Sequence, residues 1–241
     1  MADRVLVTGG TGGIGSAIVR RLAADGCRVS FTWRSDEAAA RVLAEETGAE
    51  ALRLDLADRE AVAAFAETMQ ARDEAFYGFV HNAGATHDAL AATIDIERAA
   101  EVMQVNLFAF MALTKGVVRG MTAARRGRII AIGALAASRG VTGNGAYAAS
   151  KAALEAYVRT LMTEVARRGV TANVIAPGWI DTAMAGEVPP ALARSIPAQR
   201  LGKATEIAAT VAFLLRDEAA YVNGTTLTVD GGLGGLLAAT K

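Results

Sequence analysis

The sequence has little of several things, and each shortage excludes a class of protein. Its single cysteine, Cys27, allows no disulfide within the chain, so we expect a reducing, cytoplasmic environment. Twenty-five basic residues balance twenty-five acidic ones, which leaves no excess charge for phosphate backbones, and we expect no nucleic-acid partner. No apolar run reaches the roughly 18 residues that span a bilayer, and the first residues do not resemble a secretory leader. No membrane association is therefore expected.

Proline is also scarce, and its four copies fall within one segment: Pro177, Pro189, Pro190 and Pro197. Because proline is excluded from the interiors of strands and helices, the regular alternation of elements should break there. A long insertion after a strand often covers a ligand site, so we expect a substrate lid over about residues 178–203. The alternative is a disordered surface loop, although Met184, Leu192 and Ile196 offer apolar surface for packing.

Short β-branched runs alternate with longer alanine-rich helical patterns along all 241 residues. The strand candidates are 4–8, 28–32, 50–55, 78–82, 128–133, 171–176 and 225–229. The helical patterns include 13–24, 36–47, 59–71, 96–123 and 147–168. Strands such as RIIAI are apolar throughout, which indicates burial on both faces of a parallel sheet. The sequence therefore predicts one α/β domain over residues 1–241, a three-layer doubly wound Rossmann fold with about seven parallel strands.

A glycine-rich turn, TGGTGGIG at residues 8–15, follows the first strand and opens a helix. Glycines let the backbone approach a pyrophosphate closely, and the helix N-terminus offers free N–H groups and a partial positive charge. Many turns contain three glycines, but the strand before this one and the helix after it favour dinucleotide binding. The expected cofactor contacts here are Gly9, Thr11, Gly13, Ile14 and Gly15.

The end of the second strand should select the cofactor, because NAD sites place a carboxylate there and NADP sites prefer an arginine. This chain has Arg34 and Ser35, with no carboxylate before Asp36, so we expect NADP(H). Arg34 can alternatively be a solvated surface residue. Further expected contacts follow the third and fourth strands: Asp55 for the adenine amino group, Leu56 beside it, and Asn82, Ala83 and Gly84 near the nicotinamide ribose.

Tyr147 and Lys151 are four residues apart, which places them on one face of a predicted helix. A free tyrosine titrates near 10, too high for efficient proton transfer at neutral pH, and a neighbouring ammonium should lower its pKa. The pair is therefore a candidate proton donor that can also hold the nicotinamide ribose. No cluster of metal ligands is expected.

These motifs together resemble those of the short-chain dehydrogenase/reductase family, over essentially the whole chain. The shared motifs are the glycine turn, Asn82-Ala83-Gly84, Val105-Asn106, Tyr147-x-x-x-Lys151, Pro177-Gly178 and Asp230-Gly231-Gly232. Within the family the sequence is most similar to β-ketoacyl-[acyl-carrier-protein] reductases, in stretches such as GRIIAIGA and RRGVTANVIAPGWIDTAM.

The resemblance implies roles for individual residues. Tyr147 would protonate a carbonyl oxygen, Lys151 would lower the tyrosine pKa and bind the ribose, and Asn106 would bend its helix and hold a relay water. Cofactor contacts are also implied for Pro177, Gly178, Ile180 and Thr182.

Three positions depart from the family pattern. His81 replaces the first asparagine of Asn-Asn-Ala-Gly, for which we expect a change in packing or hydrogen bonding and no new acid. Gly12 stands where NADPH-preferring turns often have a basic residue. Ala134, thirteen residues before Tyr147, stands where the family has a serine that donates to the substrate oxygen. Three explanations remain open for Ala134: an inactivating laboratory substitution, a natural enzyme that tolerates the loss, or a subunit kept for binding or assembly.

The resemblance implies reduction of a β-ketoacyl thioester with NADPH. It also suggests that Arg125 and Arg168 contact an acidic acyl-carrier protein, either within one subunit or across a subunit boundary. Arginines at a helix C-terminus can instead complement the helix dipole. The alanine-rich helices over 96–123 and 147–168 carry more apolar surface than one sheet face needs, so a homodimer or homotetramer is expected. A carbonyl reductase of free ketones and a cofactor-binding partner subunit with little turnover are the alternative functions.

Overall fold

One parallel sheet organises the computed structural model, which describes residues 2–72, 74–183, 186 and 189–236. Seven strands in this part of the chain pair in the order β3-β2-β1-β4-β5-β6-β7. They are β1 (Arg4–Thr8), β2 (Arg28–Trp33), β3 (Glu50–Arg53), β4 (Gly78–His81), β5 (Gly127–Ile132), β6 (Val170–Pro177) and β7 (Thr226–Val229). The order reverses between β1 and β4, and the crevice above such a switch point is where doubly wound sheets bind ligands. The predicted fold class is confirmed.

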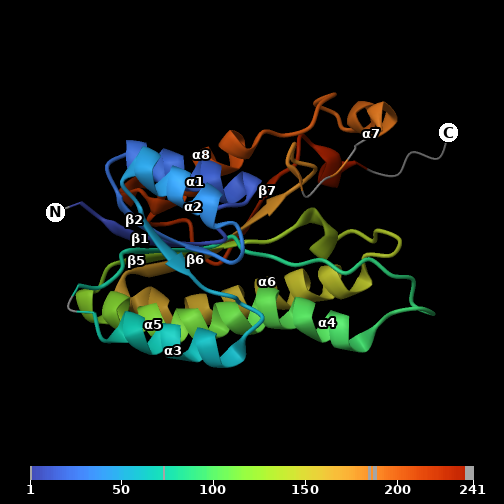
Figure 1. The fold of residues 1–241 in the computed structure, drawn as a ribbon. Coiled ribbons are helices and arrows are strands. Elements are labelled where there is room, and N and C mark those ends of the chain that lie inside the picture. Colours follow the sequence, from blue (N-terminus) through green and yellow to red (C-terminus); the bar gives the residue numbers. More distant parts are fainter. Residues whose placement is uncertain (1, 73, 184–185, 187–188, 237–241) are drawn as a thin grey trace.

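Helices cover both faces of this sheet (Figure 1). One layer contains α1 (Gly13–Ala24), α2 (Glu37–Thr47) and α8 (Ala204–Leu215). The other contains α3 (Arg59–Gln70), α4 (Ile96–Met103), α5 (Ala109–Ala124) and α6 (Gly145–Val165). Alternate strand residues serve the two layers: Val5 and Val7 of β1 pack with α1, and Leu6 packs with α5. This explains why the strands read as continuous apolar runs.

The single helix expected over 96–123 contains an irregular turn. Between α4 and α5 the chain forms a π-helical turn, η1 (Gln104–Phe108), with Asn106 at its centre. A π turn adds a residue to one turn and is often found at functional sites. Apolar periodicity does not resolve this one-residue change, so the sequence pattern reads as one helix.

The helical stretch from Ile96 to Ala124 is 29 residues long, and an 18-residue window within it has a mean hydropathy of 1.2, which is sufficient by length and composition to cross a membrane. The expectation concerned an uninterrupted apolar run, and this stretch is interrupted by Glu101, Asn106 and Lys115. In the structure, however, this stretch lies against the sheet, and α5 packs closely on α3, where a Cβ at Gly116 would lie 2.8 Å from the Ala66 carbonyl oxygen. A core helix of a folded domain satisfies the same test.

The proline-rich segment after β6 leaves the sheet and returns to it. It contains the short helix α7 (Pro190–Ser195), and Ile196 just beyond is buried against Gly231. The Ala198 N–H donates to the Gly231 carbonyl, which anchors the returning chain. Met184, whose apolar side chain favoured a packed lid, lies outside the described residues. The lid itself stays a prediction.

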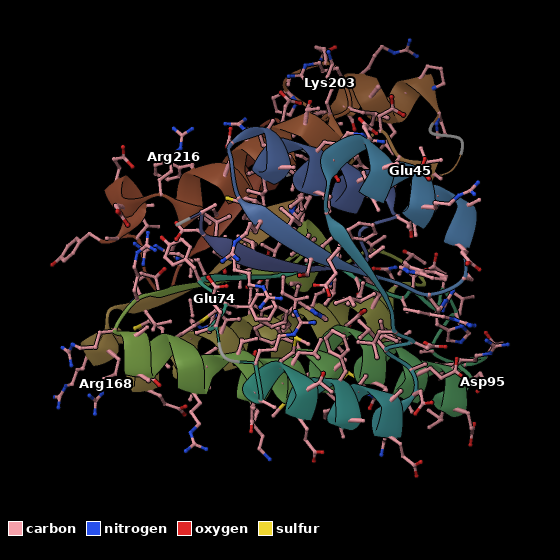
Figure 2. The ribbon with its side chains drawn as sticks, turned by 60° about the vertical axis from the view of Figure 1, so that its left-hand side comes forward. Glu45, Glu74, Asp95, Arg168, Lys203 and Arg216 are labelled. Carbon is pink, nitrogen blue, oxygen red and sulfur yellow. The ribbon has the colours of Figure 1, made fainter. Side chains whose placement is uncertain are left out.

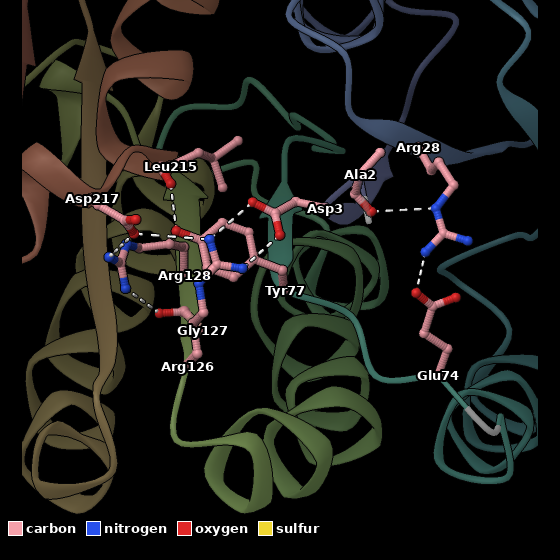
Figure 3. Close-up of polar contacts among 10 residues, drawn as sticks. All are labelled: Ala2, Asp3, Arg28, Glu74, Tyr77, Arg126, Gly127, Arg128, Leu215 and Asp217. Carbon is pink, nitrogen blue, oxygen red and sulfur yellow. Dashed lines mark hydrogen bonds and ion pairs between the residues drawn. The ribbon is translucent and has the colours of Figure 1, made fainter.

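Charged side chains form a cluster at the opposite edge of the sheet, where the strands begin (Figure 3). Arg126 pairs with Asp3, and its guanidinium carbon lies 3.9 Å from the centre of the Tyr77 ring. Arg128 is 4% exposed and its nearest carboxylate oxygen, on Asp217, is 3.5 Å away. A cavity of about 760 Å³ opens beside this cluster, and no predicted site residue lines it.

Candidate active site

The carboxyl ends of β1 and β4 are joined through the hydroxyl of Thr8. Its oxygen accepts the backbone N–H groups of Asn82 and Ala83, both at 3.1 Å. The Asn82 side-chain amide returns the contact by donating to the carbonyls of Thr8 and Gly9. The glycine turn and the Asn82-Ala83-Gly84 loop, predicted separately, therefore form one hydrogen-bonded unit.

The glycines of the turn are required by close backbone approach. Gly9 has φ +68°, and a Cβ at that position would lie 2.9 Å from the Cα of Ala83. A Cβ at Gly15 would lie 2.0 Å from the Gly9 carbonyl oxygen. The turn therefore closes so tightly that helix α1 begins directly at the sheet edge, with the N–H groups of its first turn free of intrahelical partners. This is the cradle that a pyrophosphate needs.

Thr182 and Gly13, which are both expected to contact the cofactor, lie against each other. A Cβ at Gly13 would be 2.7 Å from the Thr182 Cγ2. Ile180 is buried and forms a β-bridge with Gly202, while the Gly178 N–H donates to Val229. The segment after β6 is thus held over the start of α1.

The ends of β2 and β3 carry the residues expected to read the adenosine. Arg34 and Ser35 follow β2 and are exposed, and Arg34 has no hydrogen bond or ion pair within the described residues. The Asp36 carboxylate accepts the Ala39 N–H and so caps α2. The first carboxylate after β2 is therefore already engaged. Asp55 is exposed after β3, and its carboxylate accepts only the Ala57 N–H among the described groups.

Leu56 is buried beneath this edge, with its carbonyl accepting from the Gln104 side chain at 3.1 Å. Arg59 donates to the same Gln104 amide at 3.0 Å. The backbone after β3 is therefore attached to the π turn, a connection that no sequence pattern indicates.

Lys151 is buried at 2% exposure and donates a hydrogen bond of 2.8 Å to the carbonyl of Ile132, the last residue of β5. Burial lowers the pKa of Lys151 to about 8. Tyr147 lies one turn earlier on α6, with the centre of its ring 5.7 Å from the Lys151 Nζ. Burial raises the pKa of Tyr147 to about 12.

The pKa shift expected for Tyr147 was in the opposite direction. Spacing correctly placed the ammonium near the phenol, but it did not reveal how deeply both groups are buried. In this structure the Lys151 ammonium donates to a backbone carbonyl, and the desolvation of the phenolate outweighs its attraction to the lysine. Tyr147 is consequently a protonated phenol at neutral pH.

Asn106 is fully buried at the centre of the π turn and clamps the loop after β4. Its Oδ1 accepts the Ala85 N–H at 2.8 Å, and its Nδ2 donates to the Ala85 carbonyl at 3.0 Å. A Cβ at Gly84 would lie 3.4 Å from this Oδ1 and 3.5 Å from the Lys151 Nζ. Gly84, Asn106 and Lys151 are thus neighbours, and the expected distortion of the helix at Asn106 is present.

His81 is completely buried and packs against the stacked rings of Phe79 and Phe110, with ring centroids 6.2 and 5.3 Å away. Its Nδ1 is 3.1 Å from the Thr8 hydroxyl oxygen. That oxygen already accepts two backbone N–H groups, so the Thr8 hydroxyl is the donor in its hydrogen bond to the His81 Nδ1. The imidazole ring therefore carries its own hydrogen on Nε2. Burial and the charge of Lys151 lower the pKa of His81 to about 3. As expected, this histidine changes packing and hydrogen bonding and is no new acid.

Ala134 is buried, in extended backbone just after β5. The two hydroxyls that follow it in the chain do not replace the missing serine. Ser138 is exposed and donates to the Leu135 carbonyl, four residues from the required position, and Thr142 is exposed further along the loop.

Arg125 and Arg168 are neighbours of each other but not of Tyr147. Arg125 ends α5 and donates to the Arg167 carbonyl at 3.3 Å, while Arg168 follows α6. Twenty-one residues separate Tyr147 from Arg168, which is about 30 Å along a helix. Figure 2 shows Arg168 and Asp95, the N-cap of α4, at opposite ends of this helical layer.

Sequence reasoning missed the residues that connect these parts, above all Thr8, Gln104 and Ser150. Thr8 had a signal, because a hydroxyl at a strand end before a glycine turn faces backbone N–H groups. Gln104 and Ser150 had none, since polar residues within helices are ordinarily solvent-facing.

The family model described as Enoyl-(Acyl carrier protein) reductase matches residues 9–234. This match covers nearly all of the chain and includes the motifs discussed above except for Thr8, the first residue of the glycine turn. The chain belongs to the short-chain dehydrogenase/reductase family.

Members of this family with assigned activities are similar over almost their full lengths. The 3-oxoacyl-[acyl-carrier-protein] reductase FabG of Escherichia coli is 40% identical over 234 residues, covering 95% of this chain and 96% of the relative. FabG of Pseudomonas aeruginosa is 42% identical over 236 residues with the same coverage. The chain is thus similar to β-ketoacyl-[acyl-carrier-protein] reductases.

Two solved structures of the family resemble the fold closely. A blue fluorescent protein from a metagenomic library, in complex with NADPH, has a TM-score of 0.88 and 36% identity, covering 96% of this chain and 97% of its own. BdcA in complex with NADPH has a TM-score of 0.88 and 35% identity, covering 99% and 98%.

The buried His81 predicts a specific acid sensitivity. A histidine whose folded pKa lies below its unfolded value stabilises the fold above the unfolded pKa, and this contribution is lost as pH falls from about 6.5 toward 3. The free energy of unfolding should fall by up to about 1.4 kcal/mol per pH unit in this range from His81 alone. His81→Asn should remove that part of the slope, as measured by urea denaturation at pH 7, 6 and 5. Equal slopes in the variant and the wild type would contradict this account.

Proposed function

We propose that this chain reduces a β-ketoacyl thioester, carried by an acyl-carrier protein, to the β-hydroxyacyl form with NADPH, in fatty-acid or polyketide-like biosynthesis. The main support is one observation: Lys151, buried, lies one helical turn from Tyr147 at the sheet edge that carries the glycine turn. The FabG relatives, at about 40% identity, are named for this reaction.

The residues present fit NADP(H). The glycine turn and the N-terminus of α1 would hold the pyrophosphate, because the N–H groups of the first helical turn have no intrahelical partners and the glycines present no Cβ to the approaching group. Arg34 and Ser35 would hold the 2′-phosphate, since Arg34 has no partner within the described residues and Asp36 is engaged as a cap. The two NADPH-bound neighbours favour the same cofactor.

When bound, NADPH supplies a hydride to the substrate carbonyl carbon. Tyr147, which is protonated at neutral pH, would donate its hydroxyl proton to the carbonyl oxygen. The Lys151 ammonium would stabilise the phenolate that remains and would bind the ribose hydroxyls. Asn106 holds the loop at Ala85 so that Gly84 can lie beside both groups.

Ala134 weakens this machinery without removing the proton donor. Loss of one hydrogen-bond donor to a developing oxyanion typically costs about 10²–10³ in rate. The intact arrangement of Tyr147, Lys151 and Asn106 favours a working enzyme with reduced turnover over an inert subunit. A partner subunit with little turnover is the second candidate, and Ala134 is the specific observation in its favour.

Substrate class can be tested by following NADPH absorbance with three acceptors. We expect an acetoacetyl thioester to be reduced, a small free ketone to react at least about tenfold more slowly, and a 2-enoyl thioester, the substrate class named by the family model, not to react. NADH in place of NADPH should give a lower rate because Arg34 then has no phosphate to bind. A preference for free ketones or for the enoyl thioester would replace the proposed reaction.

The serine position leads to a direct gain-of-function prediction. Ala134→Ser should raise kcat by up to about 10²–10³, because it restores the donor to the substrate oxygen. Ala136→Ser, in the same loop and half-buried, is the matched control and should not change the rate. If NADPH binds but neither the chain itself nor its Ala134→Ser variant turns over, the binding-subunit function is supported instead.

Lys151 predicts the alkaline limit of the reaction. The charged lysine is the active form, so the rate should fall as pH rises through about 8, where its buried ammonium loses its proton. Lys151→Arg keeps a positive charge at every accessible pH, so its rate should not fall near pH 8, whatever its absolute value. The check is a kcat/KM profile for both proteins from about pH 6 to 10. If kcat/KM falls near pH 8 in both the wild type and the variant, a group other than Lys151 is titrating.

We further propose that the chain assembles as a homodimer or homotetramer and that Arg125 and Arg168 receive the carrier protein. Ile96, Phe108 and Met111 support assembly, because they leave exposed apolar surface along α4, η1 and α5. Since the two arginines lie about 30 Å from Tyr147 along the layer, a carrier bound there would serve the site of a neighbouring subunit.

The arginine proposal predicts a selective loss. Changing both Arg125 and Arg168 to alanine should raise the ratio of KM for carrier-linked substrate to KM for a small thioester by about 2- to 30-fold, for two exposed charge pairs at about 0.2–1 kcal/mol each. Arg119→Ala, an exposed arginine of α5, is the control. An unchanged ratio would remove these residues from the docking site.

A further inference from the structure

Ser150 is a buried hydroxyl within the catalytic helix. It is completely inaccessible to solvent, and it precedes Lys151 directly. Its hydroxyl donates to the Tyr147 carbonyl at 2.7 Å, a common bond within helices. It also accepts a hydrogen bond of 2.9 Å from the Asn106 Nδ2, which comes from a different element. This second contact has no intrahelical explanation.

The contact completes the hydrogen bonding of Asn106. A side-chain amide has two N–H donors, and those of Asn106 are given to the Ala85 carbonyl and to Ser150, while its Oδ1 accepts the Ala85 N–H. Asn106 is fully buried, so water does not replace a lost partner there. Ser150 therefore fixes the plane of the amide that clamps the loop after β4.

Three elements meet at this hydroxyl: the loop at Ala85, the π turn and helix α6. Each carries one part of the proposed chemistry, namely the Gly84 edge, Asn106, and the Tyr147–Lys151 pair. We propose that Ser150 is a positioning residue, which acts through Asn106 to set the catalytic helix relative to the loop after β4. This inference rests on the proposed reductase activity.

Ser150→Ala removes the hydroxyl with little change in volume. It should lower kcat by about 2- to 12-fold, the effect of one hydrogen bond worth about 0.5–1.5 kcal/mol, and leave the KM for the thioester nearly unchanged. The matched control is Thr163→Ala, also on α6, whose hydroxyl donates to the Thr160 carbonyl but is exposed and contacts no other element among the described residues. The control should keep the wild-type kcat.

A double-mutant cycle separates positioning from a local effect on the helix. If Ser150 acts through Asn106, Ser150→Ala should have no further effect on kcat in an Asn106→Ala background. Equal fold losses in the two backgrounds, or a kcat within experimental error of the wild type for Ser150→Ala, would overturn the proposal.

An activity-independent measurement keeps this test distinct from that of the function. The Ala85 amide donates to the Asn106 Oδ1, so its hydrogen exchange, followed by NMR, should be faster in Ser150→Ala than in wild type and unchanged in Thr163→Ala. Faster exchange in a chain without ketoreductase activity would support the clamp and reject the proposed function. Unchanged exchange at Ala85 would reject the clamp, whatever the activity.

Discussion

The site depends on the burial of one ammonium group. Lys151 is enclosed between the end of β5, the Gly84 backbone and the π turn, and a charge in such a place is costly unless polar groups surround it. The Ile132 carbonyl supplies one partner. Gly84 lies beside this ammonium, and the Asn106 amide binds the same loop at Ala85. Burial also shifts both pKa values, bringing that of Lys151 down to about 8 and raising that of Tyr147 to about 12.

Hydrogen bonds extend this constraint across the sheet edge. Thr8 joins the glycine turn to the loop after β4, and its hydroxyl donates a hydrogen bond to His81. Asn106 holds the same loop from the other side. A neutral His81 is consistent with this arrangement, because a positive charge on His81 would be repelled by the Lys151 ammonium. The replacement of asparagine by histidine therefore preserves a neutral hydrogen-bonding residue at a position where a charge would be harmful.

The sequence was sufficient for the architecture because strand burial and the glycine turn are local patterns. The seven strands were predicted within two residues of their observed ends, and the motifs fell at one edge because parallel strands share it. The π turn was not predictable, since adding one residue to a turn leaves the apolar pattern of residues 96–123 almost unchanged. The predicted direction of the Tyr147 pKa shift was wrong for a related reason. Spacing in the sequence shows that two groups are close, whereas desolvation depends on every element packed around the group. Gln104 and Ser150 became visible only as contacts between elements.

The position of Ala134 illustrates how binding and chemistry can separate in such a site. A serine there would act on the substrate oxygen alone, whereas Lys151 and Asn106 are each attached to the backbone that forms the cofactor crevice. Loss of the serine therefore leaves the crevice intact, because no hydrogen bond of the framework described above passes through residue 134 except the backbone contact to Ala137. Loss of the Lys151 or Asn106 side chain would instead leave buried polar groups at the switch point of the sheet without hydrogen-bond partners. An alanine at position 134 therefore breaks none of the side-chain hydrogen bonds that join these elements within the described residues, and it is weak grounds for assigning the chain a purely structural role.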